Sequence, residues 1–432
     1  MSFFQTTLLL VFGFFIIFAV LVFSGILPIF KATPDGVGGE VVLWGTLPAT
    51  SFEAPLDALN EENKESFSVR YVEKSAASFD TALVEALASG AGPDMVLLPQ
   101  DLIVRHENKV LPLPYESFSA RAFRDAFVEE GELYLRADGI LALPFSVDPM
   151  VMYWNRDIFS GAGLGKPPEE WDAFLSLAPK LTKKDAALSI TQSTIAFGDS
   201  VNVAHAKDIL AMLIMQAGNP IVESAEGARR VTLRDQRGLV TAPAQSALRF
   251  YTDFANPSKL VYSWNRSLPD SRETFAAGDL AVYFGYASER TGLAAQSPRL
   301  NFDAVVVPQT KDAERKATFG KMTGVAVLKN SRNSTTAFYA AFALTGEDFE
   351  EAFSAVSGVP PARRDVLASK RRGADALASV FYDSALISHA WLDPRPDETE
   401  RIFDAMVQNV LSGRSATSAA VSQAHEALAA LF

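Results

Sequence analysis

After an apolar N-terminal region, hydrophobic and polar positions follow two alternating patterns. Short apolar runs at 40–45, 67–72 and 94–98 predict buried strands. The helical spacing of apolar residues at 55–65 and 79–89 predicts amphipathic helices between those strands. Strands that alternate with helices predict an α/β fold with a parallel sheet, and ligands of such sheets bind at the carboxyl ends of the strands.

A long extended segment follows this region. Residues 140–155 (ILALPFSVDPMVMYWN) form an apolar run interrupted by Pro144 and Pro149, which disfavours a helix and indicates a crossing between two lobes. At least two lobes are expected, because 432 residues exceed what one hydrophobic core usually serves. The remaining patterns predict strands at 280–284, 305–308 and 323–328, and helices at 167–181, 206–216, 243–254, 335–344, 400–411 and 418–431.

The N-terminus carries a membrane-type segment. Residues 8–30 (LLLVFGFFIIFAVLVFSGILPIF) are 23 residues without a charge, which is long enough to cross a hydrocarbon core of about 30 Å. A cleaved signal peptide is the alternative, but the preceding MSFFQTT lacks a basic residue and no A-x-A cleavage pattern follows. We therefore expect an uncleaved transmembrane anchor at 1–31 and a Pro/Gly-rich linker at 32–39.

Composition narrows the possible functions. The chain has 39 basic and 51 acidic residues, a net charge of −12, which argues against a nucleic-acid partner. The absence of cysteine excludes disulfides, thiolate metal sites and thiol nucleophiles. The four histidines have no metal-binding spacing, and no serine-hydrolase elbow or distinct catalytic carboxylate pair is evident. We expect neither a metal nor a cofactor, and nothing specific supports an enzyme.

Four aromatic residues are candidates for ligand binding. Trp44 lies at the end of the first predicted strand, Tyr286 follows the strand at 280–284, Tyr153 follows the crossing segment, and Trp391 lies in a late loop. The C–H faces of sugars stack on aromatic rings, and ligand sites combine such apolar walls with a few polar groups. Packing in a core is the alternative for each ring.

The polar candidates are Thr46, Gln100, Asp101 and Asp148. The first three directly follow predicted parallel strands, so they are expected at the same edge of the sheet. Asp101 and Asp148 are expected to accept hydrogen bonds from sugar hydroxyls, and a buried ion pair is the alternative for both.

Four segments, in this order, resemble the family 1 extracellular solute-binding proteins, the maltose-binding-protein-like receptors of ABC importers. They are LPFSVDPMVMYWNRDIFSGAGLGKPPEEWDAFLSLAPKLT, ETFAAGDLAVYFGYASE, TGVAVLKNSRNSTTAFYAAFALTGEDFEEAFSAVSGVPPARRDVL and DPRPDETERIFDAMVQNVLSGRSATSAAVSQAHEAL. The chain departs from the family pattern in three respects. It lacks the usual lipidated cysteine or cleaved signal, Tyr286 stands where tryptophan is common, and EEW replaces the usual Thr before Trp171.

The resemblance implies a periplasmic-binding-protein-like fold with a cleft between two lobes. Lobe 1 would comprise 40–146 and 305–348, and lobe 2 would comprise 148–304 and 349–432. The chain would capture a sugar or oligosaccharide outside the cytoplasm, without chemistry, and deliver it to an ABC permease. A membrane-anchored, glycosidase-like envelope enzyme and a ligand-binding sensor are the alternatives. Glycerol-phosphate-like and polyamine ligands, which similar folds bind, also stay open.

Overall fold

The structure, a computed structural model, describes residues 37–432 apart from short gaps at 226–227, 312, 314 and 372–375. The expected anchor at 1–31 lies outside the described residues, as does most of the expected linker. Within the described part of the chain, no helix is both long and apolar enough to cross a membrane.

The first part of the chain forms the parallel sheet that the sequence predicts. Strand β1 (Glu40–Gly45) pairs in parallel with β2 (Ser68–Glu73) on one side and β3 (Met95–Pro99) on the other. Helices α2 (Glu53–Glu62) and α3 (Phe79–Ala88) connect these strands. The carboxyl ends of β1 and β3 therefore meet at one edge, as expected.

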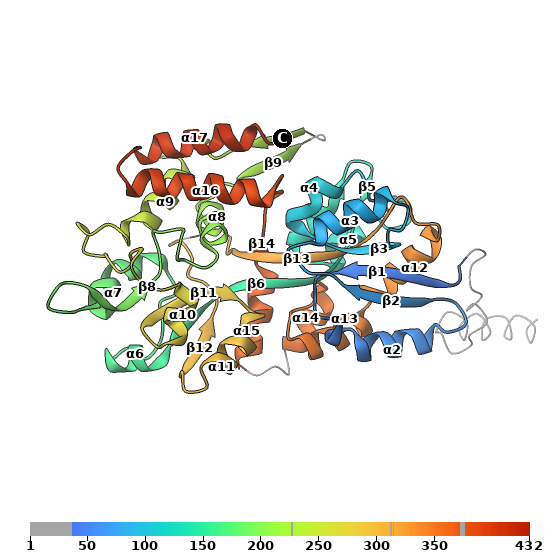
Figure 1. Cartoon of the computed structure of the whole chain (residues 1–432), viewed down its shortest axis with the longest axis horizontal. Coiled ribbons are helices and arrows are strands. Elements are labelled where there is room, and N and C mark those ends of the chain that lie inside the picture. The colour runs from blue at the N-terminus through green and yellow to red at the C-terminus, as the bar shows by residue number, and fades with distance from the viewer. Residues whose placement is uncertain (1–36, 226–227, 312, 314, 372–375) are drawn as a thin grey trace, which may run out of the picture.

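Two long antiparallel strands, β6 (Leu143–Asn155) and β13 (Thr318–Val327), run between the two halves of the molecule (Figure 1). They extend the sheet to the order β2-β1-β3-β13-β6-β11-β8-β7. The remaining strands of this sheet are β7 (Lys183–Lys184), β8 (Ile190–Ile195), β11 (Leu280–Tyr286), β12 (Phe302–Val305) and β14 (Ser388–His389). The extended crossing predicted at 140–155 is confirmed, whereas the strand expected at 305–308 ends at residue 305.

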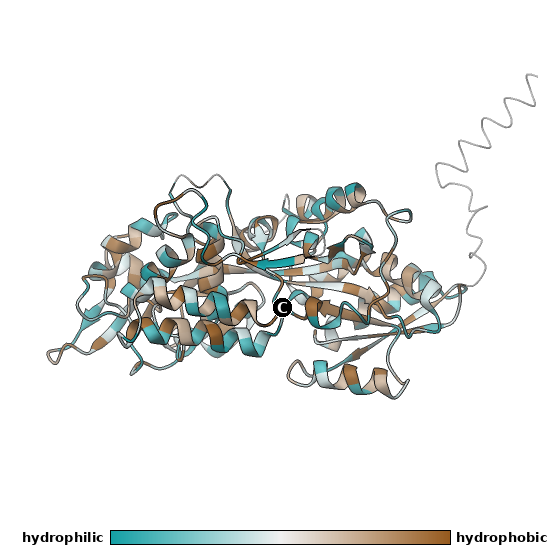
Figure 2. Cartoon of the chain, turned by 90° about the horizontal axis from the view of Figure 1, so that it is seen from above, coloured by the Kyte–Doolittle hydropathy of each residue, from teal (hydrophilic) through white to brown (hydrophobic). Residues whose placement is uncertain are grey.

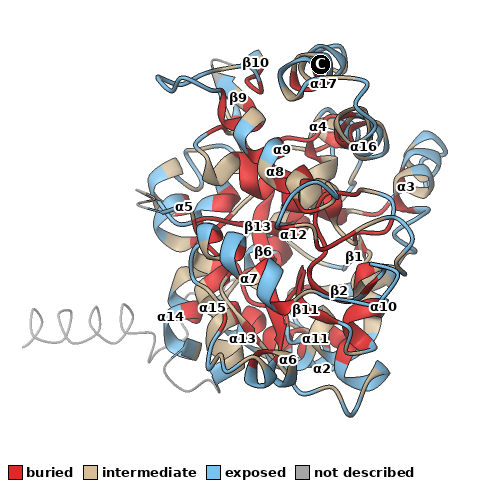
Figure 3. Ribbon diagram, turned by 90° about the vertical axis from the view of Figure 1, so that its left-hand side faces the viewer, coloured by how far each residue is buried: buried red, intermediate tan, exposed pale blue. Residues whose placement is uncertain are grey.

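Helices surround the buried strands, with apolar faces inward (Figures 2 and 3). The half of the molecule that contains β1, β2 and β3 also contains α4 (Ile103–His106), α5 (Ala120–Ala126), α12 (Ser334–Leu344), α13 (Glu347–Ser357) and α14 (Arg364–Arg371) (Figure 1). The other half, with β8, β11 and β12, contains α6 (Arg156–Gly161), α7 (Phe174–Leu181), α8 (Ala206–Gln216), α9 (Pro243–Asp253), α10 (Ser271–Ala276), α11 (Glu289–Gln296), α16 (Pro396–Leu411) and α17 (Thr417–Ala429). Helix α15 (Ala376–Leu386) and the hairpins β4 (Leu135–Arg136)–β5 (Gly139–Ile140) and β9 (Val222–Ala225)–β10 (Ala228–Val231) complete the described α-helices and strands.

Separate hydrophobic cores define the two lobes. Lobe 1 packs around residues such as Leu43, Phe52 and Phe145, and lobe 2 around a cluster of aromatic rings that includes Trp171 and Phe284. The Trp171 and Phe284 rings lie 5.4 Å apart, centroid to centroid. Trp171 begins a 3-10 turn rather than the middle of the helix expected from residue 167, because its N–H bonds the carbonyl of Gln309.

The packing differs from the expected lobe boundaries in two places. Residues 349–367, expected in lobe 2, pack in lobe 1, where the ring of Phe353 lies 4.7 Å from those of Phe52 and Phe145. Val307, expected in lobe 1, packs in the core of lobe 2. The reason is that the second crossing runs within β13, and that α13 and α14 stay beside lobe 1 before the chain returns.

Candidate functional site

A hollow of about 840 Å³ lies between the lobes. We call it the interlobe hollow. Four of the sequence-predicted site residues line it, namely Thr46, Gln100, Asp101 and Asp148. Other lining residues include Ser51, Phe79, Asp80, Arg105, Ser146, Lys321, Thr323 and Phe353, together with Ser288, Arg395, Asp397 and Glu398 from the lobe 2 side. The structure thus brings the four polar candidates together, and their contact with a ligand stays a prediction.

The strands that cross between the lobes hold part of this lining. On β6, the Oδ1 of Asp148 accepts a hydrogen bond from the backbone N–H of Ser288 at 3.0 Å, which ties β6 to the start of α11. The Nε2 of Gln100 donates to the carbonyl of Gly320 on β13, with a donor–acceptor distance of 3.5 Å. Gln100 is only 4% exposed, so its amide is held in place against β13.

Two aspartates of the lining, Asp101 and Asp148, are unusually easy to protonate. Burial, with a smaller contribution from the neighbouring Asp393, raises the pKa of Asp101 to about 6, against the opposing effect of Lys207 and Lys321. Burial also raises the pKa of Asp148 to about 6, although hydrogen bonds from Ser288 favour its charged form. Both residues are partly exposed, and both line the hollow.

Charged groups in the lining and behind it are paired. The Nζ of Lys207 lies 3.0 Å from Oδ2 of Asp393, and the Nζ of Lys321 lies 3.7 Å from Oδ2 of Asp208. The hydroxyl of Tyr286 donates to that same Asp208 oxygen at 2.6 Å. In the described part of the chain, no cluster of His, Asp or Glu residues is arranged to hold a metal ion.

Three of the predicted aromatic residues lie in the core of lobe 2 and do not line the interlobe hollow. Tyr153 is fully buried and donates a hydrogen bond to the carbonyl of Tyr286 at 2.8 Å. Trp391 stacks on Phe403, with ring centroids 6.1 Å apart. Tyr286 belongs to β11, which continues two residues past the predicted strand end, so its ring packs inside lobe 2. All three rings therefore pack in a core, which is the alternative interpretation that the sequence leaves open for each of them.

Trp44 also differs from its expected position. Its ring is partly buried against the lobe 1 core, and the Nζ of Lys74 lies 3.7 Å from the ring centroid. The strand ends at Gly45, as predicted, but Trp44 lies on a face of the sheet before that end, and Thr46 is the first residue of this segment to line the interlobe hollow. The aromatic residues among the described lining are instead Phe79 and Phe353.

Several lining residues are not indicated by any sequence pattern. Lys321 lies on β13 two residues before the predicted start of that strand, at Thr323, and Ser288 follows Tyr286 by two residues. Arg395 and Asp397 precede or begin α16, a region whose Pro-rich start marks a helix boundary without indicating its spatial neighbours. These residues line the hollow because segments that are far apart in the sequence meet there in the folded chain.

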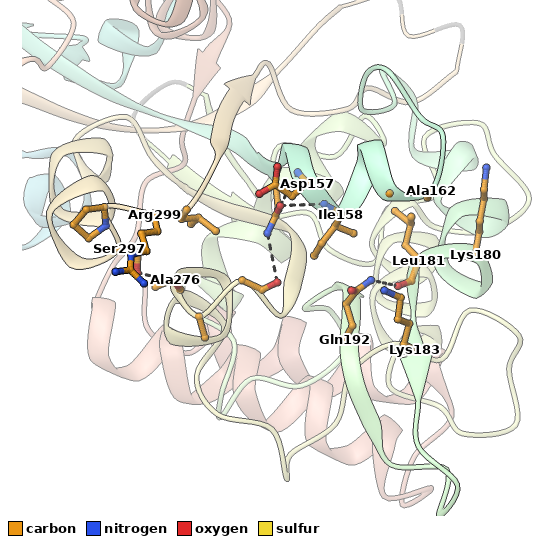
Figure 4. A pocket seen from close by; sticks show the side chains of 16 residues that line it. Asp157, Ile158, Ala162, Lys180, Leu181, Lys183, Gln192, Ala276, Ser297 and Arg299 are labelled. Atoms are coloured by element: carbon orange, nitrogen blue, oxygen red, sulfur yellow. Dashed lines mark hydrogen bonds between the residues drawn. The ribbon is translucent and has the colours of Figure 1, made fainter.

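A second hollow, of about 790 Å³, lies within lobe 2 (Figure 4). Its lining includes Asn155, whose side chain accepts hydrogen bonds from the N–H groups of Asp157 and Ile158 and so caps α6. Gln192 donates to the carbonyl of Leu181 beside it. All of its lining comes from lobe 2, so a hinge motion between the lobes would not enclose a ligand there. The interlobe hollow is the better candidate.

Comparison with known proteins gives a family and a fold. Residues 54–378 match the family described as bacterial extracellular solute-binding protein. Binding proteins of Brucella abortus and Brucella suis are 20% identical over 287 residues, which is 66% of this chain and just under two thirds, 66%, of each Brucella protein.

Solved structures resemble nearly the whole chain. The sugar-binding protein MalE of Xanthomonas citri has a TM-score of 0.73 at 16% identity, covering 91% of this chain and 97% of that one. A solute-binding protein from Thermotoga lettingae, bound to α-D-tagatose, has a TM-score of 0.67 at 20% identity, covering 91% and 99%. UgpB of Mycobacterium tuberculosis, in complex with glycerophosphocholine, has a TM-score of 0.71 at 17% identity, covering 91% and 98%. At these identities the likeness shows the fold.

Proposed function

The chain belongs to the bacterial extracellular solute-binding protein family, and from this premise we propose that it captures a sugar or oligosaccharide in the interlobe hollow and delivers it to an ABC permease. The family consists of non-catalytic solute-binding proteins, and the periplasmic-binding-protein-like α/β fold agrees with the expectation from the sequence. Transport energy would come from a separate ATPase.

The observation that carries this proposal is the shared lining of the interlobe hollow. Thr46 and Asp101 line it from lobe 1, and Ser288 and Arg395 from the lobe 2 side. A ligand that contacts both sides stabilises the arrangement in which the lobes are close together. The two strands β6 and β13 supply the connection about which such a motion can occur.

The resemblance to sugar-binding proteins supports a carbohydrate as the ligand. The solved relatives that bind carbohydrates include the Thermotoga lettingae protein with α-D-tagatose and a maltodextrin-binding protein with maltotetraose. The carboxylates and the amide that line the hollow here can accept hydrogen bonds from hydroxyl groups.

We further propose that residues 8–30 anchor the chain in the cell membrane, with the two lobes outside the cytoplasm. The support is the uncharged run of 23 residues and the absence of an A-x-A cleavage pattern after it. Family membership supports the extracytoplasmic location.

A thermal-shift screen of the full chain against mono- and oligosaccharides tests the proposed function. A ligand present at a hundred times its Kd stabilises the folded state by about 2.7 kcal/mol, which raises the melting temperature by several degrees. We expect at least one carbohydrate to do so. A screen in which no carbohydrate raises the melting temperature would contradict the proposal.

A further inference from the structure

Helix α12 (Ser334–Leu344) of lobe 1 has apolar residues on its outward face as well as on its inward one. Its 11 residues include no charged side chain. The inward face is the buried stripe of Thr336, Ala337, Ala340, Ala341 and Leu344. On the outward face, Tyr339 is 44% exposed and Phe342 is 39% exposed, with Phe338 partly buried beside them. A helix at the surface of a globular domain normally has polar or charged residues on its outward face, so α12 is unusual.

A ring from another segment extends this apolar face. Phe118, in the loop before α5, contacts Phe342 edge to face, with the ring centroids 5.7 Å apart. Residues 338, 339 and 342 are neighbours on the helix surface, because they are three and four positions apart. We call Phe118, Phe338, Tyr339 and Phe342 the aromatic patch. Contiguous apolar groups that are exposed in this way mark interaction surfaces.

The aromatic patch lies where the described chain begins. The N–H of Gly38 donates to Oγ1 of Thr336 at 3.0 Å, and Nδ2 of Asn333 donates to the carbonyl of Gly38 at 3.4 Å. The start of β1 and helix α12 therefore lie at the same end of lobe 1, away from lobe 2 (Figure 1). The proposed anchor ends at Phe30, and a fully extended backbone from Phe30 to Val37 spans at most about 25 Å. Helix α12 is itself about 16 Å long, so a bilayer that holds the anchor lies within its reach.

The charges that flank α12 in the sequence differ between its two ends. Lys329 and Arg332 are exposed in the turn that leads into the helix, on the side of Gly38. Glu347 and Asp348 are exposed after its other end. Basic side chains are attracted to anionic lipid headgroups and acidic ones are repelled. This asymmetry favours an orientation in which the N-terminal end of α12 is nearest to the membrane.

We propose that the aromatic patch contacts the surface of the membrane that holds the proposed anchor, so that lobe 1 lies against the bilayer through α12. Aromatic side chains are enriched at the boundary between lipid headgroups and hydrocarbon, and an apolar helix face binds there through the area that it buries. The inference rests on the proposed anchor at 8–30 and is independent of the ligand. None of the four patch residues belongs to the described lining of the interlobe hollow, so this contact leaves that lining free.

Quenching by labelled lipids tests the contact on the full chain. Because the chain has no cysteine, one cysteine introduced at Thr335, which is exposed on the outward face of α12, carries a single fluorophore. The control position is Val84 on α3, which is 40% exposed and lies on the opposite face of the lobe 1 sheet. Each labelled chain is reconstituted in vesicles of phosphatidylethanolamine and phosphatidylglycerol, and flotation shows whether it stays with the bilayer. We expect nitroxide-bearing lipids to quench the label at 335 and to leave the label at 84 unquenched.

The outcomes separate the patch from the anchor. Equal quenching at 335 and 84 in a chain that floats with the vesicles would overturn the inference and leave the anchor in place. A chain that does not float would overturn both. A label at 335 that is shielded from water yet not quenched by the lipids would place a second copy or another protein segment on the patch, and would also overturn the lipid contact.

A double variant, Tyr339→Ser with Phe342→Ser, tests the exposed rings themselves. We expect the quenching at 335 to fall to the level at 84, while the chain still floats because residues 8–30 are unchanged. The matched control is Val84→Ser, which removes a similarly exposed apolar side chain and should leave the quenching at 335 unchanged. Quenching at 335 that persists in the double variant would overturn the role of the aromatic rings. If the double variant does not fold, the comparison of positions 335 and 84 in the otherwise unmodified chain decides the inference.

Discussion

The carboxyl of Asp101 shows how one residue of the hollow affects folding. Burial raises its pKa from an ordinary 3.8 to about 6. An acid with a raised pKa in the folded chain binds more protons when folded than when unfolded, in the window between the two values. The folded state therefore becomes less stable as pH rises through that window. A charge that lowers stability at neutral pH is typical of a residue kept for function.

We predict that Asp101→Asn is more stable than the unmodified chain at pH 8, by on the order of 1 kcal/mol, and equally stable at pH 4. The expected gain is smaller than the full pKa shift implies, because the group is partly exposed to solvent. Urea denaturation at the two pH values measures it. A variant that is less stable at pH 8, or that shifts equally at both values, would show that the effect comes from shape.

Gly320 is a second notable residue, because its surroundings leave no space for a side chain. It pairs with Pro149 where β13 and β6 pass between the lobes. A Cβ atom at Gly320 would lie 2.0 Å from Oε2 of Glu130 and 2.8 Å from Cβ of Ser388, both of which are buried. A methyl group there must move the strand or these neighbours.

We therefore predict that Gly320→Ala lowers the free energy of unfolding by about 2–3 kcal/mol. The matched control is Gly165→Ala, because nothing lies within 4 Å of a Cβ built at Gly165. The control should change stability by less than about 0.5 kcal/mol. Thermal denaturation of the two variants compares them, and equal melting temperatures would contradict the packing described for Gly320.

At the scale of elements, the β9–β10 hairpin of lobe 2 reaches lobe 1. The Nη2 and Nη1 atoms of Arg229 lie 2.5 and 3.2 Å from the two carboxyl oxygens of Glu107, which also pairs with Arg136. The Arg229 side chain is 12% exposed, so solvent screens this bidentate pair little. The hairpin thus provides an ionic contact between the lobes, far along the chain from Glu107.

Arg229→Ala should lower the free energy of unfolding by about 1–3 kcal/mol, because it leaves Glu107 with a single partner. Arg230→Ala is the control, since Arg230 is 60% exposed and pairs with Glu223 and Asp235 inside lobe 2. Exposed pairs of this kind contribute at most about 1 kcal/mol. Guanidinium denaturation distinguishes the two variants, and an equal loss in both would rule out a special role for the Arg229 contact.

Elements with strong periodicity could be predicted from the sequence, but their spatial neighbours could not. Helix α8 (Ala206–Gln216) has the predicted bounds, and β6 is the extended crossing that its prolines indicate. The β9–β10 hairpin was not predicted, because its residues show no apolar alternation. Tyr153 was wrongly expected at the site for a similar reason, because its position in a strand does not show whether its ring faces the core or the hollow.

On the scale of the whole molecule, the polar candidates could be located because parallel strands end at a common edge. Thr46, Gln100 and Asp101 follow β1 and β3, and all three line the interlobe hollow. The lobe 2 side of the lining comes from segments near Ser288 and Arg395. Their local sequence does not show that they face the strand ends of lobe 1. Only the continuous sheet through both lobes brings the two sides together.

The proposed anchor yields a prediction for the intact cell. Because residues 8–30 are uncharged and long enough to span a bilayer, we expect the protein to keep its N-terminus and to stay with the membrane fraction after a high-salt wash. N-terminal sequencing and fractionation check both points. A soluble protein whose N-terminus begins beyond Phe30 would contradict the anchor.

We predict that ligand binding in the interlobe hollow changes the position of one lobe relative to the other. Because the chain has no cysteine, two introduced cysteines can carry spin labels without competing sites. We choose Arg121 in lobe 1, whose side chain is 92% exposed, and Val240 in lobe 2, which is 96% exposed. The control pair is Val240 and Leu188, both in lobe 2.

The measurement is the distance distribution between the labels, without ligand and with a saturating carbohydrate taken from the thermal-shift screen. We predict that the ligand shifts the distribution between positions 121 and 240 and leaves the distribution between positions 188 and 240 unchanged. An unchanged distance between 121 and 240 at saturation would contradict the claim that the lobes move about β6 and β13 when ligand binds.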